Sequence, residues 1–256
     1  MRSGREALLV HASQVGIVGA FLVLWQLAAP LGLMGTDMLP PFSDVLNVLW
    51  KEMHDRTFLS DVALTLVEII VAFFAMVPVG LLLGFLIGES PVLYAVTRPL
   101  LQGLMAVPKA MFLPFFVMIL GIGFVEKAAF AGVLGIFVVI MNGIAAVHSI
   151  PHGLIVAARS MGANRAQLYL RIYLPGMLPL LLTGVRVGLI FTIFGVLLGE
   201  MYASAHGLGR SIFDAGEAFH FPQMFAGVFL VVVFSIAANE ILRLLETASR
   251  RRRGLQ

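Results

Sequence analysis

The sequence contains no cysteine and few charged residues. The absence of cysteine excludes disulfides, thiolate catalysis and thiolate metal sites. Charged residues make up 12% of the 256 residues, about half of the roughly 25% found in a soluble domain. Hydrophobic residues make up 60% and stand in long blocks, which a bilayer span requires and a soluble core does not. These features predict an all-α, polytopic membrane protein.

Several chemical signatures are also missing. The sequence has no G-x-x-x-x-G-K-[ST] phosphate-binding motif and no cluster of acid, base or metal-ligating residues, so we expect neither an enzyme nor a metal site. The net charge of +3 is attributed to charge bias in the loops, and no basic patch interleaved with aromatic residues indicates a nucleic-acid partner. His148 and His152 are separated by Pro151, so we expect a pair of loop histidines.

Six apolar stretches are predicted to cross the membrane. The first follows Arg2 and Arg5 and is longer than the roughly 7–15 residues of a signal-peptide core, so it is expected to be retained. The third is interrupted by Pro108 and Pro114. The predicted spans are residues 14–34, 60–88, 99–120, 126–148, 177–201 and 223–246.

Glycines recur at spacings of four within these spans, as at Gly80, Gly84 and Gly88 and again at Gly184 and Gly188. Small residues at this spacing let helices approach closely in lipid. We expect them to pack helices inside one bundle and not to form a dedicated dimer face.

The distribution of Lys and Arg predicts the orientation of the spans. With a cytoplasmic N-terminus, 11 of these residues lie on the cytoplasmic side and 4 on the other. Those four are Lys51, Arg56, Lys127 and Arg210. Both termini are therefore predicted to be cytoplasmic, with residues 1–13 as a cytoplasmic N-terminus and residues 14–256 as one transmembrane domain.

Two connecting segments of this domain are distinctive. Residues 35–58 are predicted to be periplasmic and to contain a short amphipathic helix capped by Ser43. Residues 149–176 are predicted to be cytoplasmic, and they combine good helix formers with three arginines and a central Gly162. We expect two short helices joined by a turn. Their small side chains suit insertion into a groove on another protein, and the alternative is a connector lying on the membrane surface.

The spacing within this second segment resembles the EAA loop of bacterial ABC importer permeases. Residues 157–158 (Ala-Ala) are followed by Gly162 and, after nine intervening residues, by residues 172–175 (Ile-Tyr-Leu-Pro). The one departure is Val156, which stands where the motif has Glu. Other stretches resemble the sulfonate, taurine and nitrate permease group, and together they cover nearly the whole chain beyond about residue 36. They are LPPFSDVLNVLW, VPKAMFLPFFVMILGIG, LLTGVRVGLIFTIFGVLLGEM and HGLGRSIFDA.

The resemblance implies a type I ABC importer permease (MetI-like) fold in the bacterial cytoplasmic (inner) membrane. Two permease copies, expected to be identical, would each dock the loop into one subunit of an ATPase dimer. A periplasmic or lipid-anchored binding protein would deliver the solute, and membrane lipids would surround the spans. ATP and Mg²⁺ would belong to the ATPase, so the chain itself is expected to be non-catalytic and to bind no cofactor.

The resemblance also implies roles for individual residues. The loop at Gly207, Leu208 and Gly209 is expected to line the periplasmic gate. The expected docking residues are Ala157, Ala158, Arg159, Ser160, Met161, Gly162, Ala163, Asn164 and Arg165.

The resembling group imports sulfonates, taurine, nitrate and bicarbonate, which favours a small anion as the solute. A thiamine-pyrimidine or aromatic compound is the alternative within the same class. An ion-coupled secondary transporter would also account for six spans and buried carboxylates. It would not account for the EAA-like loop, and the two halves show no inverted repeat.

Five polar or charged residues are predicted to lie within the spans, where charge is costly and marks functional candidates. They are Glu68, Lys109, Asn142, Arg186 and Glu200. Lys109 and Arg186 would give the pathway a positive potential that suits an anion. The alternative is that they pair with Glu68 and Glu200 and only fix helix packing.

Overall fold

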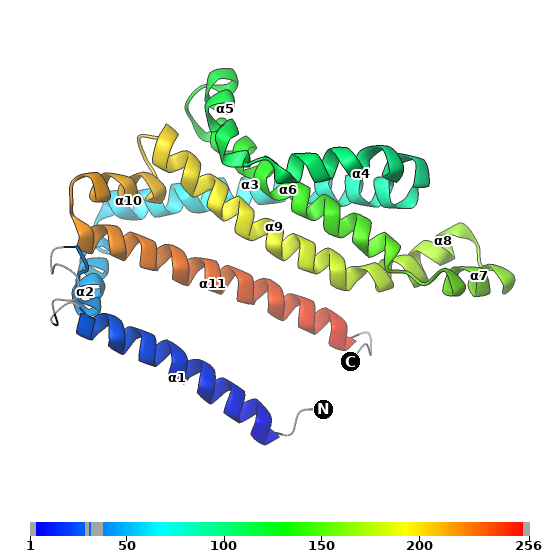
Figure 1. Ribbon diagram of the computed structural model, residues 1–256, viewed down its shortest axis with the longest axis horizontal. Helices are drawn as coiled ribbons and strands as arrows, with labels where there is room; N and C mark the ends of the chain where they lie inside the picture. The colour runs from blue at the N-terminus through cyan, green and yellow to red at the C-terminus, as the bar shows by residue number, and fades with distance from the viewer. Residues whose placement is uncertain (1–3, 29–30, 32–37, 253–256) are drawn as a thin grey trace. The chain divides into compact units, whose positions relative to one another are not determined.

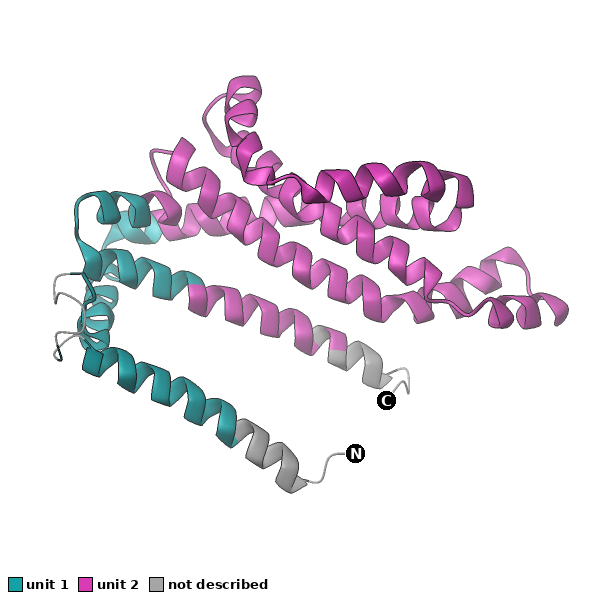
Figure 2. Cartoon of the chain, in the orientation of Figure 1, with its two compact units in different colours: residues 1–60, 211–231 teal, residues 61–210, 232–256 magenta. Residues whose placement is uncertain are grey.

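The computed structural model describes residues 4–28, 31 and 38–252, and every regular element in them is helical (Figure 1). The chain forms two compact units (Figure 2). The first comprises residues 1–60 and 211–231, and the second comprises residues 61–210 and 232–256. The start of the predicted cytoplasmic N-terminus, residues 1–3, and residues 35–37 of the predicted periplasmic segment lie outside the described residues.

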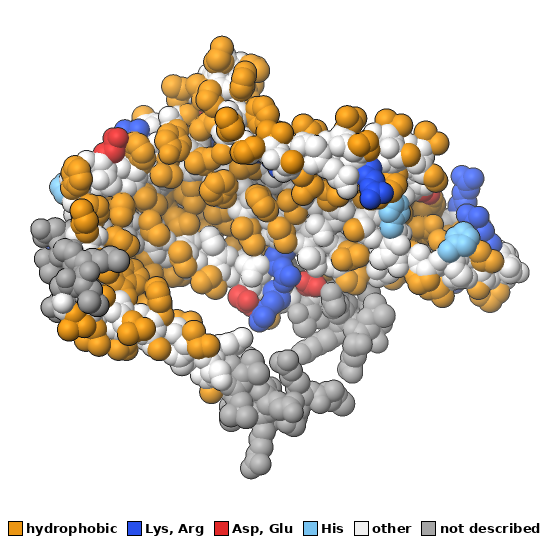
Figure 3. Space-filling model, viewed as in Figure 1, with side chains coloured by type: hydrophobic (Ala, Val, Ile, Leu, Met, Phe, Trp, Pro, Cys, Tyr) orange, Lys and Arg blue, Asp and Glu red, His pale blue; other side chains and the backbone are white. Residues whose placement is uncertain are grey.

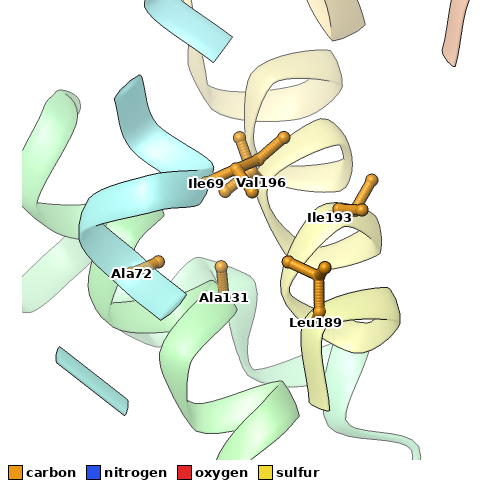
Figure 4. Close-up of a cluster of buried hydrophobic side chains, with 6 residues drawn as sticks. All are labelled: Ile69, Ala72, Ala131, Leu189, Ile193 and Val196. Carbon is orange, nitrogen blue, oxygen red and sulfur yellow. The ribbon is translucent and has the colours of Figure 1, made fainter. Parts of the chain in front are cut away.

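Three long helices form the centre of the second unit. They are α6 (Phe124–His148), α9 (Leu174–Ala203) and most of α3 (Arg56–Glu89). Helices α6 and α9 pack against each other along much of their length (Figure 1). A cluster of buried aliphatic side chains joins all three helices (Figure 4). Its members are Ile69 and Ala72 from α3, Ala131 from α6, and Leu189, Ile193 and Val196 from α9.

The close approach of these helices depends on glycine. Val139 of α6 is fully buried and contacts a glycine on each neighbouring helix. A Cβ on Gly80 would lie 2.9 Å from the Val139 Cβ, and one on Gly188 would lie 2.7 Å from its Cγ2. A Cβ on Gly84 would lie 2.7 Å from the carbonyl oxygen of Ile140. Hydrophobicity alone does not drive helix association in lipid, whereas close packing does. The expectation that these glycines pack helices within one bundle is confirmed.

The structure supports fewer spans than the six predicted. Four helical stretches of the described residues are long and apolar enough to cross a membrane. They are Arg56–Glu89, Phe124–His148, Arg165–Ala203 and the first part of α11 (Phe221–Arg252), up to Leu244. The predicted first span, 14–34, overlaps α1 (Gly4–Ala28), whose apolar part Ala12–Ala28 is shorter. Hydrophobic side chains cover most of the face shown in Figure 3.

The predicted third span, 99–120, is wrong in its first residue, and the chain bends at Pro108, one of the two prolines predicted to interrupt it. Helix α4 (Pro91–Ala106) starts earlier, and a second stretch made of η1 (Lys109–Phe112) and α5 (Leu113–Leu120) follows at an angle of 87°. Proline has no backbone N–H and forces the preceding residue into an extended conformation. Val107, before Pro108, accordingly has φ −75° and ψ 132°. This pair counts as a fifth span only if it crosses as one broken unit.

In the first unit, Trp25 of α1 holds the start of α2 (Phe42–Glu52). Its indole Nε1 donates a hydrogen bond to the carbonyl of Pro40 over 3.1 Å. Its ring centroid lies 5.2 Å from that of Phe42. The prediction of Ser43 as the N-cap is wrong, because α2 starts at Phe42, after Pro41, without a side-chain cap. The N–H of Ser43 instead donates to the side chain of Gln26 over 2.9 Å.

Candidate functional site

The segment 149–176 contains the two short helices that the sequence predicts. They are α7 (His152–Ser160) and α8 (Arg165–Leu168), and both lie at one end of the α6–α9 pair (Figure 1). Gly162 has φ +83°, a left-handed conformation that glycine adopts without steric cost. Its N–H donates to the carbonyl of Arg159 over 2.9 Å, and the N–H of Ala163 donates to that of Ala158 over 3.0 Å. These two bonds form a Schellman motif that ends α7.

A capping box begins α8. Asn164 Oδ1 accepts a hydrogen bond from the N–H of Gln167, and Gln167 Oε1 accepts one from the N–H of Asn164, both over 2.9 Å. This reciprocal pair satisfies backbone donors that the first turn of a helix leaves free. Residues 161–164, which we call the coupling turn, are therefore fixed at both ends by local hydrogen bonds.

Most of the predicted docking residues, in and beside the coupling turn, are exposed, and one of them is buried. Met161 is 81% exposed. Ala158 is only 7% exposed but lines a pocket together with Met161 and Gly162, and its role in docking stays a prediction. Ala163 is half-buried, and the other six predicted docking residues are exposed: Ala157, Arg159, Ser160, Gly162, Asn164 and Arg165. Val156, at the position of the motif Glu, is also exposed.

Helix α8 continues into the following long helix. A π-helical turn, η2 (Tyr169–Tyr173), links it to α9, so that Arg165–Ala203 forms one apolar helical stretch of 39 residues. The sequence predicted a separate span beginning only at residue 177. The side chain of Leu168 is buried and holds α8 against the rest of its unit. Because of this continuity, a displacement of the coupling turn reaches α9 through helix and not through a flexible loop.

A cluster of buried charges lies at the other end of the α6–α9 pair, and we call it the charge cluster. Glu68, Glu126, Lys127 and Glu200 are each at most 3% exposed. Lys127 Nζ lies 2.6 Å from Glu68 Oε1 and donates a hydrogen bond to Ser204 Oγ over 3.0 Å. Beyond this ion pair, the carboxylates of Glu68 and Glu126 accept no hydrogen bond from the described residues. Three buried carboxyl groups therefore share one ammonium within the described part of this cluster.

Lys127 was predicted to lie among the charges of the outer loops, but its side chain is buried. The ammonium is buried because α6 starts at Phe124, so that Lys127 already lies in its first turn against α9. The adjacent Glu126–Lys127 pair at the start of a long apolar run was the available signal. Thr65, which also belongs to this region, gave no signal in the sequence.

The loop at residues 207–209 is held by the same region. Glu200 accepts hydrogen bonds from Thr65 Oγ1 over 2.6 Å and from the N–H of Gly209 over 2.7 Å. Thr65 Oγ1 accepts one from the N–H of Leu208, and Asp61 Oδ1 accepts one from the N–H of Gly207, both over 2.9 Å. All three predicted gate residues are buried. Helix α10 (Leu208–Glu217) begins within this loop.

The remaining predicted pathway residues lie apart from this cluster. Lys109 Nζ donates to the carbonyl of Met105 over 3.4 Å and lies 5.5 Å from the ring centroid of Phe137. Asn142 donates to a carbonyl of its own helix. Arg186 lies 3.6 Å from Glu246. The alternative pairing of Lys109 and Arg186 with Glu68 and Glu200 is therefore wrong in its partners.

The two histidines also differ from the predicted loop pair. His148 is the last residue of α6, and its Nε2 donates to the carbonyl of Gly88 over 3.1 Å, whereas His152 begins α7. Among the described residues, no group of three or more His, Cys, Asp or Glu could hold a metal ion.

The comparisons with known proteins agree on one class. Residues 76–253 match the family described as the binding-protein-dependent transport system inner membrane component. The chain is 32% identical to the taurine transport system permease protein TauC of Escherichia coli, over 91% of this chain and 86% of that protein. It is 26% identical to the putative aliphatic sulfonates transport permease protein SsuC of Bacillus subtilis, over 88% and 82%.

More distant matches extend this picture. The formylaminopyrimidine transport permease protein ThiX of Halalkalibacterium halodurans is 24% identical over 88% of this chain and 89% of that protein. A structure of the MetNI methionine ABC transporter in an inward-facing conformation matches with a TM-score of 0.59 and 24% identity. The match covers 73% of this chain and 91% of the matched chain of that transporter. At this identity the likeness supports the fold alone.

Proposed function

Because the chain belongs to the family of binding-protein-dependent transport system inner membrane components and is the permease subunit of an ABC importer, we propose that it carries a small sulfonate or a similar anion and docks an ATPase through residues 149–176. The chain is non-catalytic, since a separate ATPase subunit hydrolyses ATP, and the family implies a substrate-binding protein as a further partner. Family membership does not support the ion-coupled transporter considered from the sequence.

The observation that carries the docking proposal is the geometry of the coupling turn. Its backbone is fixed by the Schellman motif and the capping box, while Met161 at its tip is 81% exposed. An exposed apolar side chain on a rigid turn can enter a pocket on a partner with little loss of conformational entropy. The exposed Arg159 and Arg165 lie on either side of it and can pair with carboxylates at the rim of such a pocket.

In the proposed mechanism, ATP binding closes the ATPase dimer and moves the docked coupling turn. Helix α8 and α9 then move together, because the π-helical turn Tyr169–Tyr173 joins them without a break. Such π-helical turns often lie at functional sites. The far end of α9 carries Glu200, which holds the loop at residues 207–209. Movement of α9 would thus couple ATP binding to the predicted periplasmic gate, which is allosteric coupling between two distant sites.

The proposed assembly contains two identical permease chains, an ATPase dimer on the cytoplasmic side and a binding protein on the periplasmic side of a bacterial inner membrane. The excess of Lys and Arg on the predicted cytoplasmic loops supports this orientation. Both termini would then be cytoplasmic.

The proposed solute class follows from the relatives that are named for taurine and aliphatic sulfonates. It is supported by Lys109, which has no carboxylate partner among the described residues and so contributes an uncompensated positive charge near the predicted pathway. The formylaminopyrimidine relative supports a second candidate, a neutral or cationic pyrimidine. Lys109 favours the anion over that candidate.

The proposal is tested by purifying the tagged chain in mild detergent and identifying the proteins bound to it by mass spectrometry. We expect a stoichiometric ATPase subunit. After reconstitution with that ATPase and its cognate binding protein, taurine should stimulate ATP hydrolysis. Absence of any ATPase would contradict the docking proposal, and stimulation by a pyrimidine but not by taurine would contradict the solute class.

Two methionines provide a matched pair of variants for the docking surface. Met161 and Met118 are 81% and 82% exposed, but Met118 lies on α5. Met161→Gln should lower ATPase capture and stimulation at least tenfold, whereas Met118→Gln should leave both unchanged. Gly162→Asp, which adds strain and charge at the turn, should abolish capture. If Gly162→Asp left the ATPase coupled, the assigned docking turn would be wrong.

A further inference from the structure

A pocket between α4 and α6 has features that neither the transport pathway nor the docking turn explains. It is lined by Tyr94, Arg98 and Gln102 of α4 and by His148 of α6, over a floor that includes the buried Ile144. Its volume is 240 Å³, below the roughly 300–1,000 Å³ of pockets that hold drug-sized ligands. The pocket lies where α6 ends and α7 follows, so it is on the same end of the bundle as the coupling turn.

We propose that this pocket binds a small tetrahedral oxyanion, a sulfonate or a phosphate. The residues Tyr94, Arg98 and Gln102 stand four apart, so they lie on one face of α4 and all line the pocket. A guanidinium presents several N–H donors in a planar fork that matches oxyanion geometry. The amide of Gln102 and the hydroxyl of Tyr94 supply further donors.

The charge of Arg98 is available for such a ligand. Among the described residues no carboxylate pairs with it, and its guanidinium carbon lies 5.7 Å from the centroid of the Tyr94 ring. Two other cations of the second unit, Lys127 and Arg186, each lie beside a glutamate. Arg98 thus differs from them in facing a pocket and not a carboxylate.

A relay of contacts positions the guanidinium. His148 Nε2 donates to the carbonyl of Gly88 over 3.1 Å, which fixes its ring. The Tyr94 ring packs edge-on against His148, with centroids 4.6 Å apart and an interplanar angle of 89°. Tyr94 in turn stacks with Arg98. A side chain that is already ordered loses less entropy when it binds a ligand, so this relay favours binding.

The oxyanion can come from two sources. One is a transported sulfonate that leaves the pathway near the coupling turn, which rests on the proposed function, and the other is the headgroup of an anionic phospholipid. The site itself depends on neither, since both present the same tetrahedral group to Arg98.

The test measures binding directly, without ATPase or transport, so that its failure is distinct from failure of the proposed function. The full chain is placed in nanodiscs of phosphatidylcholine, and methanesulfonate binding is followed by calorimetry and by ligand-observed NMR. Arg98→Gln should weaken saturable binding at least tenfold, and Tyr94→Leu should weaken it severalfold by removing the stacking partner. Arg56→Gln, the same substitution at an exposed arginine outside both the pocket and the docking surface, should leave binding unchanged.

A second arm uses native mass spectrometry after nanodiscs that contain phosphatidylglycerol. Retention of phosphatidylglycerol that Arg98→Gln abolishes and methanesulfonate displaces would support the site with a lipid headgroup as one occupant. Methanesulfonate binding without lipid retention would support a free sulfonate as the occupant. No saturable binding of either probe, or equal loss in Arg98→Gln and Arg56→Gln, would overturn the proposal.

Discussion

Residues 161–164 and residues 204–209 are both short turns between helices, but different kinds of hydrogen bond hold them. The coupling turn is exposed and is fixed by bonds between residues at most five apart in the sequence. The turn at 204–209 is buried over Gly207, Leu208 and Gly209, and it is held by side chains of α3 and α9. Its contacts with α3 join residues 143 and 146 positions apart.

This difference separates two mechanical roles. A turn with local hydrogen bonds keeps its shape while its helices move, which is what a docking element needs. A turn held by side chains of two other helices keeps its shape only while those helices keep their relative positions. The coupling turn therefore keeps its conformation when its helices move, whereas the conformation of the turn at 204–209 depends on the positions of α3 and α9.

The largest effect should follow from removing the one cation of the charge cluster. Lys127→Met leaves Glu68 buried without a counter-ion, and breaking a buried pair in this way costs about 3–5 kcal/mol. We expect a large fall in melting temperature in detergent. Lys109→Met is the control, because Lys109 bonds only to a carbonyl among the described residues. Equal losses in the two variants would show that Lys127 does not stabilise the cluster.

A smaller but still large effect should follow from a methyl group in the buried turn. Gly207 has φ +110°, and a Cβ there would overlap the Glu200 carboxylate. Gly207→Ala should therefore displace Glu200 and lower the melting temperature. Gly121→Ala is the matched control, since Gly121 has φ +74° but no atom within 4 Å of the added Cβ. The control should cost only the backbone strain of an alanine at φ +74° and ψ 171°, on the order of 1–3 kcal/mol, and a similar cost for both variants would contradict the contact with Glu200.

A substitution in the coupling turn should lower the stability of the protein less than it lowers ATPase stimulation. Asn164→Ala removes the capping box, which costs about 1 kcal/mol of helix stability. We expect a small shift in melting temperature but a clear loss of ATPase stimulation, because the turn loses its fixed shape. Thr97→Ala is the control, since among the described residues its hydroxyl bonds only to the carbonyl of Leu93 within α4, away from the coupling turn. If Asn164→Ala left ATPase stimulation intact, the rigidity of this turn would not matter for docking.

The sequence predicted the coupling turn well because its determinants are local. The position of Gly162, the helix formers on both sides and the EAA-like spacing all lie within about twenty residues. Both short helices appear where they were expected. The burial of Ala158 was not predicted, because it depends on the packing of α7 against other elements.

The buried end could not be predicted in the same way. Its bonds join Thr65 with Glu200 and Asp61 with Gly207 across more than half of the chain, and no local pattern encodes such pairs. Lys127 was assigned to a loop because hydropathy places span ends only approximately. The bend at Pro108 was visible as a proline, but its 87° angle and the early start of α4 depend on how the helices pack.

The smallest effect should come from Asp55, an exposed carboxylate that, like Glu200, accepts hydrogen bonds from backbone N–H groups. Asp55 Oδ1 accepts hydrogen bonds from the N–H groups of Thr57 and Phe58, over 2.6 and 3.3 Å, where α3 begins. The hydrogen bond from Thr57, and to a smaller extent the one from Phe58, holds the pKa of Asp55 below its usual value.

A carboxyl group whose pKa is lower in the folded state stabilises the protein at pH values above its unfolded-state pKa, which is about 3.9 for Asp. This stabilisation disappears as the pH falls through the folded-state pKa. The melting temperature of the native chain should therefore exceed that of Asp55→Asn by a small margin at pH 6, and the margin should vanish toward pH 3. Because solvent screens an exposed charge, the margin should stay well below the loss caused by Lys127→Met. A margin of the same size at both pH values would show that the charge of Asp55 does not stabilise the start of α3.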